Sequence, residues 1–234
     1  MAKKFIEQDC LTCSLYASSV FKHLTQNEIK QVFMDKNCTH YKRGTEIYHE
    51  GSRTNGIYCI NNGIIKLFKT GYDGREQIIR FAKAGDIIGY RSLLSKEVAC
   101  TTAKTIEDAS LCYIPGYIVL DLVKSNPDFS LELIQLSCKE LGDANKFIID
   151  IAQKNIRERL AEVLLLLRDT FGLNEQNELQ VSLTREELAN IVGTATESVI
   201  RLLSEFKADK LIEIEGRKIR LLEIKKLTKI SNVF

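Results

Sequence analysis

The chain has 234 residues, with 33 lysines and arginines against 31 aspartates and glutamates, and a formal net charge of +2. This balance excludes a strongly basic protein that coats nucleic acid without specificity, and the length suffices for two domains with separate cores. The longest apolar run, Val163 to Leu167, is far too short to cross a membrane, and no secretory signal is apparent. We therefore expect a cytoplasmic protein whose seven cysteines are mostly thiols or metal ligands.

Residues 1–22 form a leader, and residues 23–121 have the pattern of a domain rich in strands. Apolar and polar residues alternate between about Thr39 and Tyr113, and glycines recur between them. Asn61-Asn62-Gly63 and Asp73-Gly74 are hairpin signals, because these residues tolerate the positive φ of tight turns. Many short strands joined by regular turns predict a closed or double-sheet β structure such as a jelly roll.

Residues 122–153 contain a long helix with one apolar stripe. Within Phe129 to Gln153, the stripe recurs at alternating steps of three and four residues, which is the spacing of a coiled-coil seam. The seam residues are Leu131, Ile134, Cys138, Leu141, Asn145, Ile148 and Ala152. The polar Asn in the seam fits a parallel pair of helices with a specified register. A helix buried within a single chain is the alternative.

Residues 154–234 carry the pattern of two short helices joined by a tight turn. Leu188, Ala189 and Val192 recur at helical spacing, and Gly193 then permits the positive φ of a turn between helices. We expect Thr194 to cap the second helix, because its hydroxyl can accept from the unpaired amides of a helix start. Together these features predict a helix-turn-helix.

The second helix of this pair has the pattern of a recognition helix. Glu197 and Arg201 lie four residues apart on its exposed face, where side chains can reach base edges in a major groove. Leu211 to Leu222 alternates around Glu215-Gly216-Arg217 and predicts a hairpin that forms a wing. An ordinary helical hairpin with a surface ion pair is the alternative.

The order of β-roll, long helix and winged helix-turn-helix resembles the Crp/Fnr family of bacterial transcription regulators over nearly the whole chain. The matching motifs are Lys42-Arg43-Gly44 through His49-Glu50-Gly51, Ile57 to Gly63, Gly85-Asp86-Ile87-Ile88-Gly89, Ile191-Val192-Gly193, and Glu197 to Arg201. The resemblance implies an α+β fold with an N-terminal β-jelly-roll sensor domain, a long dimerisation helix and a C-terminal winged helix-turn-helix domain. It also implies a homodimer on a palindromic operator of double-stranded DNA, with RNA polymerase as a further partner.

Carried over residue by residue, the resemblance implies that Glu197 and Arg201 read bases. Arg can bind a guanine edge bidentately and Glu can accept from cytosine N4, so a half-site such as TGA is expected. The other implied contacts are Thr196 and Ile200 at flanking readout positions, and Arg185, Thr194, Ser198, Arg217 and Lys218 near phosphates. For the wing cations, a solvated hairpin tip is the alternative.

The sequence argues against cyclic AMP bound in the usual mode of the family. Relatives that bind it have a Glu after the Gly-Asp-x-x-Gly motif for the ribose, and a later Arg-Ser or Arg-Thr pair for the phosphate. Here Tyr90 stands at the Glu position and Cys100-Thr101 at the pair. A buried phosphate would lack its guanidinium. The candidate effector pocket comprises Gly85, Asp86, Gly89, Tyr90, Arg91, Cys100 and Thr101.

The Fnr branch implies a different cofactor, a [4Fe-4S] cluster held by three N-terminal cysteines and one late in the roll. Cys10 and Cys13 lie in the leader and Cys112 occupies the fourth-ligand position, but Ser19 stands where the third cysteine belongs. Four thiolates are the usual cage. Cys10, Cys13 and Cys112 are therefore candidate iron-sulfur ligands in a set that lacks one member.

Other cysteines leave alternatives open. Cys38, Cys59 and Cys100 could supply the missing ligand, although their spacing favours strand interiors, where free cysteine is often buried as a small hydrophobe. Structural or redox-reactive thiols, a Cys10–Cys13 disulfide, and zinc with Cys112 are further alternatives. The cofactor is thus unknown from the sequence.

Other functions have less support. The only histidines, His23, His40 and His49, form no paired spacing for haem or another metal, nor a cupin-like cluster. Nucleophile elbows, phosphate loops and zinc-protease helices are absent from the sequence, so we do not expect an enzyme. A small-molecule-binding β-roll protein without DNA affinity is the alternative. We predict a dimeric transcription regulator in which a signal at the roll changes the pairing of the long helices.

Overall fold

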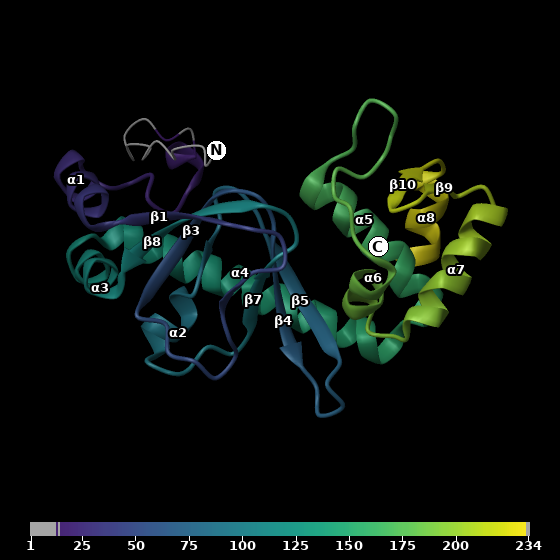
Figure 1. The fold of residues 1–234 in the computed structure, drawn as a ribbon, viewed down its shortest axis with the longest axis horizontal. Coiled ribbons are helices and arrows are strands. Elements are labelled where there is room, and N and C mark those ends of the chain that lie inside the picture. The colour runs from purple at the N-terminus through teal and green to yellow at the C-terminus, as the bar shows by residue number, and fades with distance from the viewer. Residues whose placement is uncertain (1–12, 14, 233–234) are drawn as a thin grey trace. The chain divides into compact units, whose positions relative to one another are not determined.

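A computed structural model describes Cys13 and residues 15–232 of the chain (Figure 1). The chain divides into two compact units, one within residues 1–69 and 79–142 and the other within residues 70–78 and 143–234. The division runs through the long helix α4 (Pro127–Gln153), whereas the sequence analysis drew its boundary at the end of that helix. No helix among the described residues is long and apolar enough to span a membrane.

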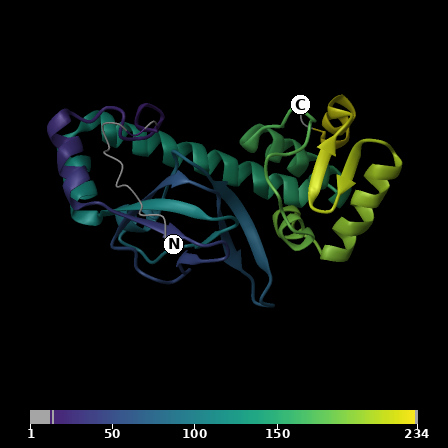
Figure 2. The same ribbon diagram turned by 45° about the horizontal axis from the view of Figure 1, so that its top comes forward.

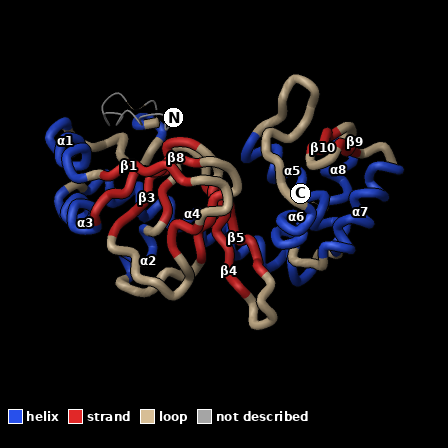
Figure 3. Tube along the Cα trace, in the orientation of Figure 1, coloured by secondary structure: helices blue, strands red, loops and turns tan. Residues whose placement is uncertain are grey.

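The strands of the sensor roll form two four-stranded sheets, in the orders β1-β8-β3-β6 and β2-β7-β4-β5 (Figure 3). The bounds are β1 Asn37–Tyr41, β2 Glu46–Tyr48, β3 Gly56–Asn62, β4 Ile65–Thr70, β5 Glu76–Ala82, β6 Ile87–Ile88, β7 Thr102–Thr105 and β8 Ala109–Pro115. Gly63 and Gly74 adopt positive φ, at 91° and 79°, in the turns after β3 and β4. The predicted jelly roll is therefore confirmed. The Asp73-Gly74 turn joins the neighbouring strands β4 and β5 and is a hairpin as predicted, whereas the Asn61-Asn62-Gly63 turn is not a hairpin, because β3 and β4 belong to different sheets.

Two apolar clusters hold this unit together. One lies between the sheets and includes Ile60 and Leu111 from the first sheet and Leu67 and Ala103 from the second. The other packs helices on the roll, and it joins residues of α4 to Tyr90. The helices of the unit besides α4 are the 3-10 helix η1 Tyr16–Ser18, α1 Gln26–Asp35, α2 Tyr90–Ser95 and α3 Gly116–Ser125.

The long helix α4 has two different apolar faces. Phe129 and Leu133 are buried in the cluster on the roll, at 0% and 2% exposure. The predicted seam lies on the opposite side, and all seven of its residues are exposed within the single chain. Leu141 and Ile148, for example, are 63% and 64% exposed. The seam is therefore not buried within one chain, which was the alternative to a coiled coil.

The second unit contains a helix pair, a hairpin and two supporting helices. The bounds are α5 Ile156–Phe171, α6 Arg185–Val192, α7 Thr196–Ala208, β9 Ile212–Glu215, β10 Lys218–Leu221 and α8 Ile224–Ser231. Asn155 begins α5 with a capping box in which its side chain and that of Glu158 bind each other's backbone amides. The core between these elements contains fully buried Leu160, Leu164, Phe206 and Leu227.

The end of α4 is joined to α5 by a small network of ion pairs. The Lys154 ammonium lies 2.8 Å from Asp150 and 2.6 Å from Glu162, and the Lys146 ammonium lies 2.8 Å from the other Glu162 oxygen. Burial alone would raise the pKa of the Glu162 carboxyl, but hydrogen bonds from Lys146 and Lys154 bring it below its ordinary value. Glu162 therefore stabilises the fold only when it is ionised.

We expect Glu162→Gln to lower the free energy of unfolding by about 1 kcal/mol at pH 7. Because the folded pKa is lowered, this contribution is present above the ordinary Glu pKa of about 4.3 and is lost as the pH falls through the folded value. Urea unfolding followed by circular dichroism should show the stabilities of the two proteins differing at pH 6 and converging as the pH falls below about 4.3. Glu175→Gln, in an exposed turn, is the control. A difference in unfolding free energy between the parent protein and Glu162→Gln that does not change with pH would contradict a stabilising role of the ionised Glu162 carboxylate.

Candidate nucleic-acid interface and sensor cavity

The helix-turn-helix is built by a capped first helix and a glycine turn. The Thr184 hydroxyl accepts from the Glu187 amide at 3.0 Å, and the Glu187 carboxylate accepts from the Thr184 amide at 2.7 Å, which fixes the start of α6. Gly193 ends α6 with φ of 73°, as predicted. The expected Thr194 cap is wrong, because the Thr194 amide donates to Ala189 and still closes α6, so that Ala195 begins α7 without a side-chain cap.

The outer face of α7 presents polar side chains. Val199 and Leu203 bury its inner face at 0% and 1% exposure, whereas Glu197 and Arg201 are exposed. In the part of the chain that the structure describes, Glu197 and Arg201 form no ion pair with each other. Thr196 and Ser198 are half-buried, and Ile200 is 48% exposed. The two predicted base-reading groups thus share one accessible face.

The predicted wing is the β9–β10 hairpin, the pair of yellow arrows in Figure 2. Arg217 is exposed at its turn, and the Lys218 ammonium lies 3.7 Å from Glu178. Arg185 was expected near phosphate, but its guanidinium donates to the Gly216 carbonyl at 2.8 Å, and burial lowers its pKa. Arg185 therefore ties the wing turn to the start of α6.

Arg159, which the sequence analysis did not single out, holds the turn of the helix pair in place. Its guanidinium donates to the carbonyls of Val192 at 3.0 Å and Gly193 at 3.3 Å, at the end of α6. It also donates to Ile151 and Lys154 at the end of α4, at 3.2 and 3.1 Å. Arginine is a common residue in helices, so no sequence signal distinguishes this one.

The residues of the predicted effector pocket lie in different surroundings, and Thr101 and Gly89 both form a hydrogen bond with the buried Tyr48 side chain. Tyr90 is 1% exposed within the apolar cluster that contains Phe129 of α4, and burial raises the pKa of its hydroxyl. Arg91 and Cys100 are exposed. Burial also raises the pKa of Tyr48 to about 12, and its ring would lie 3.8 Å from a Cβ placed on Gly89. Aromatic side chains therefore occupy the part of the roll beside Gly89.

Gly85 and Asp86 of the same predicted set line a polar cavity of about 260 Å³ against α4. It has both signs of charge, because Arg80 and Lys139 face it together with Glu132 and Glu140. The Arg80 guanidinium and the Glu140 carboxylate form an ion pair across 2.9 Å. The cationic groups of this cavity are thus partly neutralised from within the protein.

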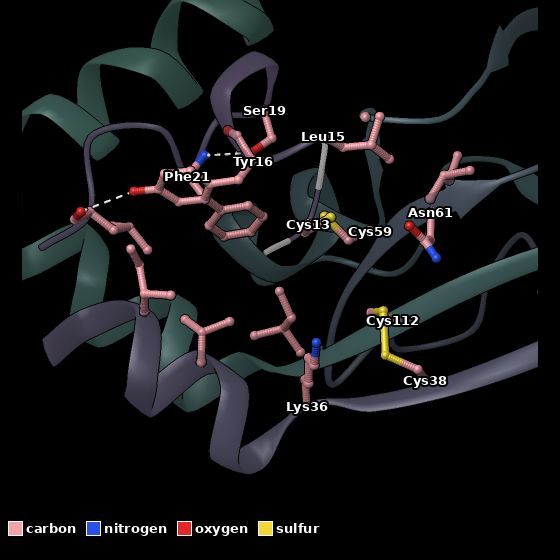
Figure 4. A pocket seen from close by; sticks show the side chains of 16 residues that line it. Cys13, Leu15, Tyr16, Ser19, Phe21, Lys36, Cys38, Cys59, Asn61 and Cys112 are labelled. Atoms are coloured by element: carbon pink, nitrogen blue, oxygen red, sulfur yellow. Dashed lines mark hydrogen bonds between the residues drawn. A yellow bond between two sulfur atoms is a disulfide. The ribbon is translucent and has the colours of Figure 1, made fainter. Parts of the chain in front are cut away.

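A second cavity, of about 70 Å³, is apolar and contains four cysteines (Figure 4). They are Cys13, Cys38, Cys59 and Cys112, and they share the cavity with side chains such as Phe21, Val32 and Ile114. Cys38 and Cys112 form a disulfide, because they are direct partners in the antiparallel pair of β1 and β8. Cys13, Cys59, Cys100 and Cys138 keep their thiols.

The disulfide-bonded structure agrees only in part with the predicted iron-sulfur ligands. Cys13 and Cys112 line the same cavity, and Cys10 lies outside the described residues. The expectation of Cys112 as a free ligand is corrected, because its sulfur is bonded to Cys38. Ser19 is buried, and its hydroxyl donates to the Tyr16 carbonyl at 2.9 Å and accepts from the Phe21 amide.

With the disulfide closed, the described residues do not fit a four-thiolate cage. No group of three histidine, cysteine or acidic side chains among them is placed to hold a metal ion.

A β-roll with a ligand-sized cavity, joined to a winged helix-turn-helix with an accessible second helix, defines a DNA-binding protein with a sensor domain. Residues 38–126 match the family model of the cyclic nucleotide-binding domain, and residues 158–230 match that of the Crp-like helix-turn-helix domain. The chain belongs to the Crp/Fnr family and is a DNA-binding transcription regulator of that type, which confirms the predicted family, fold class and general function.

Known proteins agree with this assignment. The fumarate and nitrate reduction regulatory protein of Vibrio cholerae is 27% identical over 229 residues, which cover 96% of this chain and 90% of the relative. Electron transport regulator A of Shewanella oneidensis is 27% identical, over 92% of this chain and 86% of the relative. The structure of FixK2 from Bradyrhizobium japonicum has the same fold, with a TM-score of 0.77 and 23% identity over 85% of this chain and 98% of that chain.

We expect Arg159→Ala to destabilise the second unit by about 2 kcal/mol, because it removes a charged donor from four carbonyl oxygens. Arg159→Lys should recover only part of the lost stability, since an ammonium cannot reproduce the planar set of donors of a guanidinium. Urea unfolding followed by circular dichroism measures both variants. Arg168→Lys, whose partner is the adjacent Asp169, is the control. Equal stability of the Arg159 variants and the control would show that the carbonyl contacts contribute little.

Proposed function

We propose that the protein acts as a homodimer that binds a palindromic operator through α7 and responds to a signal at the sensor roll. The observation that carries the DNA-reading part is the outer face of α7, where Glu197 and Arg201 are both exposed and form no ion pair with each other. An Arg and a Glu on one accessible helix face can bind guanine and cytosine edges in a major groove. Arg217 on the wing is placed to contact phosphate beside them.

The dimer is supported by the exposed seam of α4. Leu131, Ile134, Leu141 and Ile148 are between 51% and 64% exposed, and they form one stripe along the helix. Contiguous apolar surface of this kind marks an interaction site. A second copy of the same helix fits best, because heptad spacing with one Asn is self-complementary in a parallel pair.

The sensor ligand in this proposal is not cyclic AMP. Tyr90 lies in the apolar core at the position where relatives that bind the nucleotide have a Glu, and Arg91 is exposed instead of facing a phosphate. In this part of the roll the Tyr48 ring lies beside Gly89, and the nearby Arg80 guanidinium is already paired with Glu140 and so is partly neutralised for a phosphate. Action in the cytoplasm and contact with RNA polymerase stay predictions.

Selection from random DNA duplexes should enrich a palindrome with a G·C pair in each half-site. Arg201→Ala removes one bidentate contact per half-site, worth about 1–3 kcal/mol, so operator affinity should fall roughly tenfold or more at constant salt. Affinity for unrelated DNA should change little. Arg217→Ala is the comparison, because loss of a phosphate contact weakens all sequences about equally and reduces the salt dependence. Failure to enrich any sequence would favour the alternative, a small-molecule-binding β-roll protein without DNA affinity.

Leu141→Lys places a charge in the α4 seam and should convert the dimer to monomer, because two lysines would then face each other in an apolar interface. Sedimentation velocity at micromolar concentration measures the change. The matched control is Asp143→Lys, two residues away on the same helix, exposed and on the side away from the seam, which should remain dimeric. A monomeric parent protein, or a dimeric Leu141→Lys variant, would contradict a dimer formed through this seam.

A further inference from the structure

The polar cavity of about 260 Å³ lies against α4 and is separate from the place where relatives bind a cyclic nucleotide. Its wall comes from the segment before α1, from β5 and the turn between β5 and β6, and from one face of α4. Tyr90, Cys100 and Thr101, which stand at the nucleotide-binding positions, are not part of this wall. The cavity is therefore a second space in the sensor unit, and its own charges decide what it can bind.

Three of the charged side chains around the cavity are neutralised within the protein. The Arg80 guanidinium and the Glu140 carboxylate form an ion pair across 2.9 Å, and their side chains are only 27% and 13% exposed. The Glu132 carboxylate lies 2.7 Å from the Lys22 ammonium, and a hydrogen bond from Lys22 holds the pKa of the Glu132 carboxyl below its ordinary value. These groups thus leave little net charge for a ligand.

The other two charged side chains of the wall, Asp86 and Lys139, have opposite signs. Asp86 accepts a hydrogen bond from the Lys83 backbone amide at 2.9 Å through one oxygen, and it has no ion-pair partner among the described residues. In the same part of the chain, neither the Lys139 ammonium nor the Gln135 amide, one turn earlier on α4, forms a hydrogen bond or an ion pair. A carboxylate and an ammonium therefore face one cavity without pairing with each other.

We propose that this cavity binds a free α-amino acid, with the ammonium group of the ligand on Asp86 and its carboxylate on Lys139 and Gln135. A small zwitterion supplies the complementary charge to both side chains at once. An anion or a cation alone would leave one of the two without a partner. Hydrogen bonds between charged groups are roughly twice as strong as those between neutral groups, so this arrangement selects strongly for a ligand with both charges.

The size of the cavity and the rest of its wall favour an aliphatic amino acid. A volume of 260 Å³ corresponds to about nine water molecules at about 30 Å³ each, which is room for an amino acid of the size of valine or leucine. Val20, Ile87 and Leu136 form the apolar part of the wall. Burial of an aliphatic side chain against them adds hydrophobic stabilisation to the two charged contacts.

The bound amino acid would connect the roll to the long helix. Asp86 belongs to the turn before β6, whereas Gln135 and Lys139 belong to α4, so a ligand held by all three joins these two elements. Lys139 lies two residues before Leu141 of the exposed seam. This inference rests on the proposed function, because it names the chemical class of the signal that biases the pairing of α4.

Failure of this inference can be told apart from failure of the proposed function, because amino-acid binding is measured on the protein without DNA. A protein that binds an amino acid here but selects no operator would contradict the proposed function and keep the site. A protein that selects an operator but binds no amino acid would keep the proposed function and lose the site.

The test is isothermal titration calorimetry of the protein with glycine, alanine, valine and leucine. We expect leucine or valine to bind more tightly than glycine, and we expect leucine binding to weaken at least tenfold in Asp86→Asn and in Lys139→Gln. Asp86→Asn keeps an oxygen that can accept from the Lys83 amide, so the turn retains its hydrogen bond. Asp121→Asn and Lys124→Gln change the same charges on the exposed face of α3, and these matched controls should bind leucine like the parent protein.

Two further probes separate a zwitterion from simpler ligands. Succinate carries only negative charge and putrescine only positive charge, so neither should approach the affinity of leucine. The proposal is overturned by the absence of binding with all four amino acids at millimolar concentration, or by succinate or putrescine that binds as tightly as leucine. Leucine binding that is unchanged in Asp86→Asn or in Lys139→Gln would equally overturn it, and glycine that binds as tightly as leucine would contradict the apolar contribution.

Discussion

Much of the molecule depends on the two faces of α4, which cannot both be covered by one chain. Phe129 and Leu133 are buried against the roll, while the seam that includes Leu141 and Ile148 stays in water. Exposed apolar area costs about 25 cal/mol per Å², so a continuous stripe drives association with a partner of the same shape. Because the inner face of the same helix packs on the roll, a change inside the roll can alter how the outer face pairs.

The roll itself keeps the architecture of a nucleotide-binding domain while its interior chemistry differs. Tyr90 enters the apolar core where relatives that bind cyclic AMP have a carboxylate, and Tyr48 fills space beside Gly89. Both aromatic rings pack inside the roll and stabilise it. The cavity that remains next to α1 is apolar and lined with sulfur.

The fold was largely predictable because its signals are local or periodic. Turn glycines such as Gly63 and Gly74, and the seven-residue seam of α4, are determined by nearby residues and need no knowledge of tertiary contacts. The exposed face of α7 follows from the same periodicity. Thr194 shows the limit, since helix boundaries shift when a turn can be closed by a backbone bond instead of a side-chain cap.

The meeting of the cysteines at one cavity was not predictable, because it depends on how strands pair across long stretches of sequence. Cys38 and Cys112 are 74 residues apart, and their contact exists only because β1 and β8 pair in one particular register. A slip of one residue would turn every side chain of the strand to the other face. The position of Cys59 next to Cys112 depends on a second register, that of β3 with β8 in the same sheet. A spacing motif can reveal neighbouring cysteines in a loop, such as Cys13, whereas cysteines that meet on neighbouring strands become visible only when the sheet order is known.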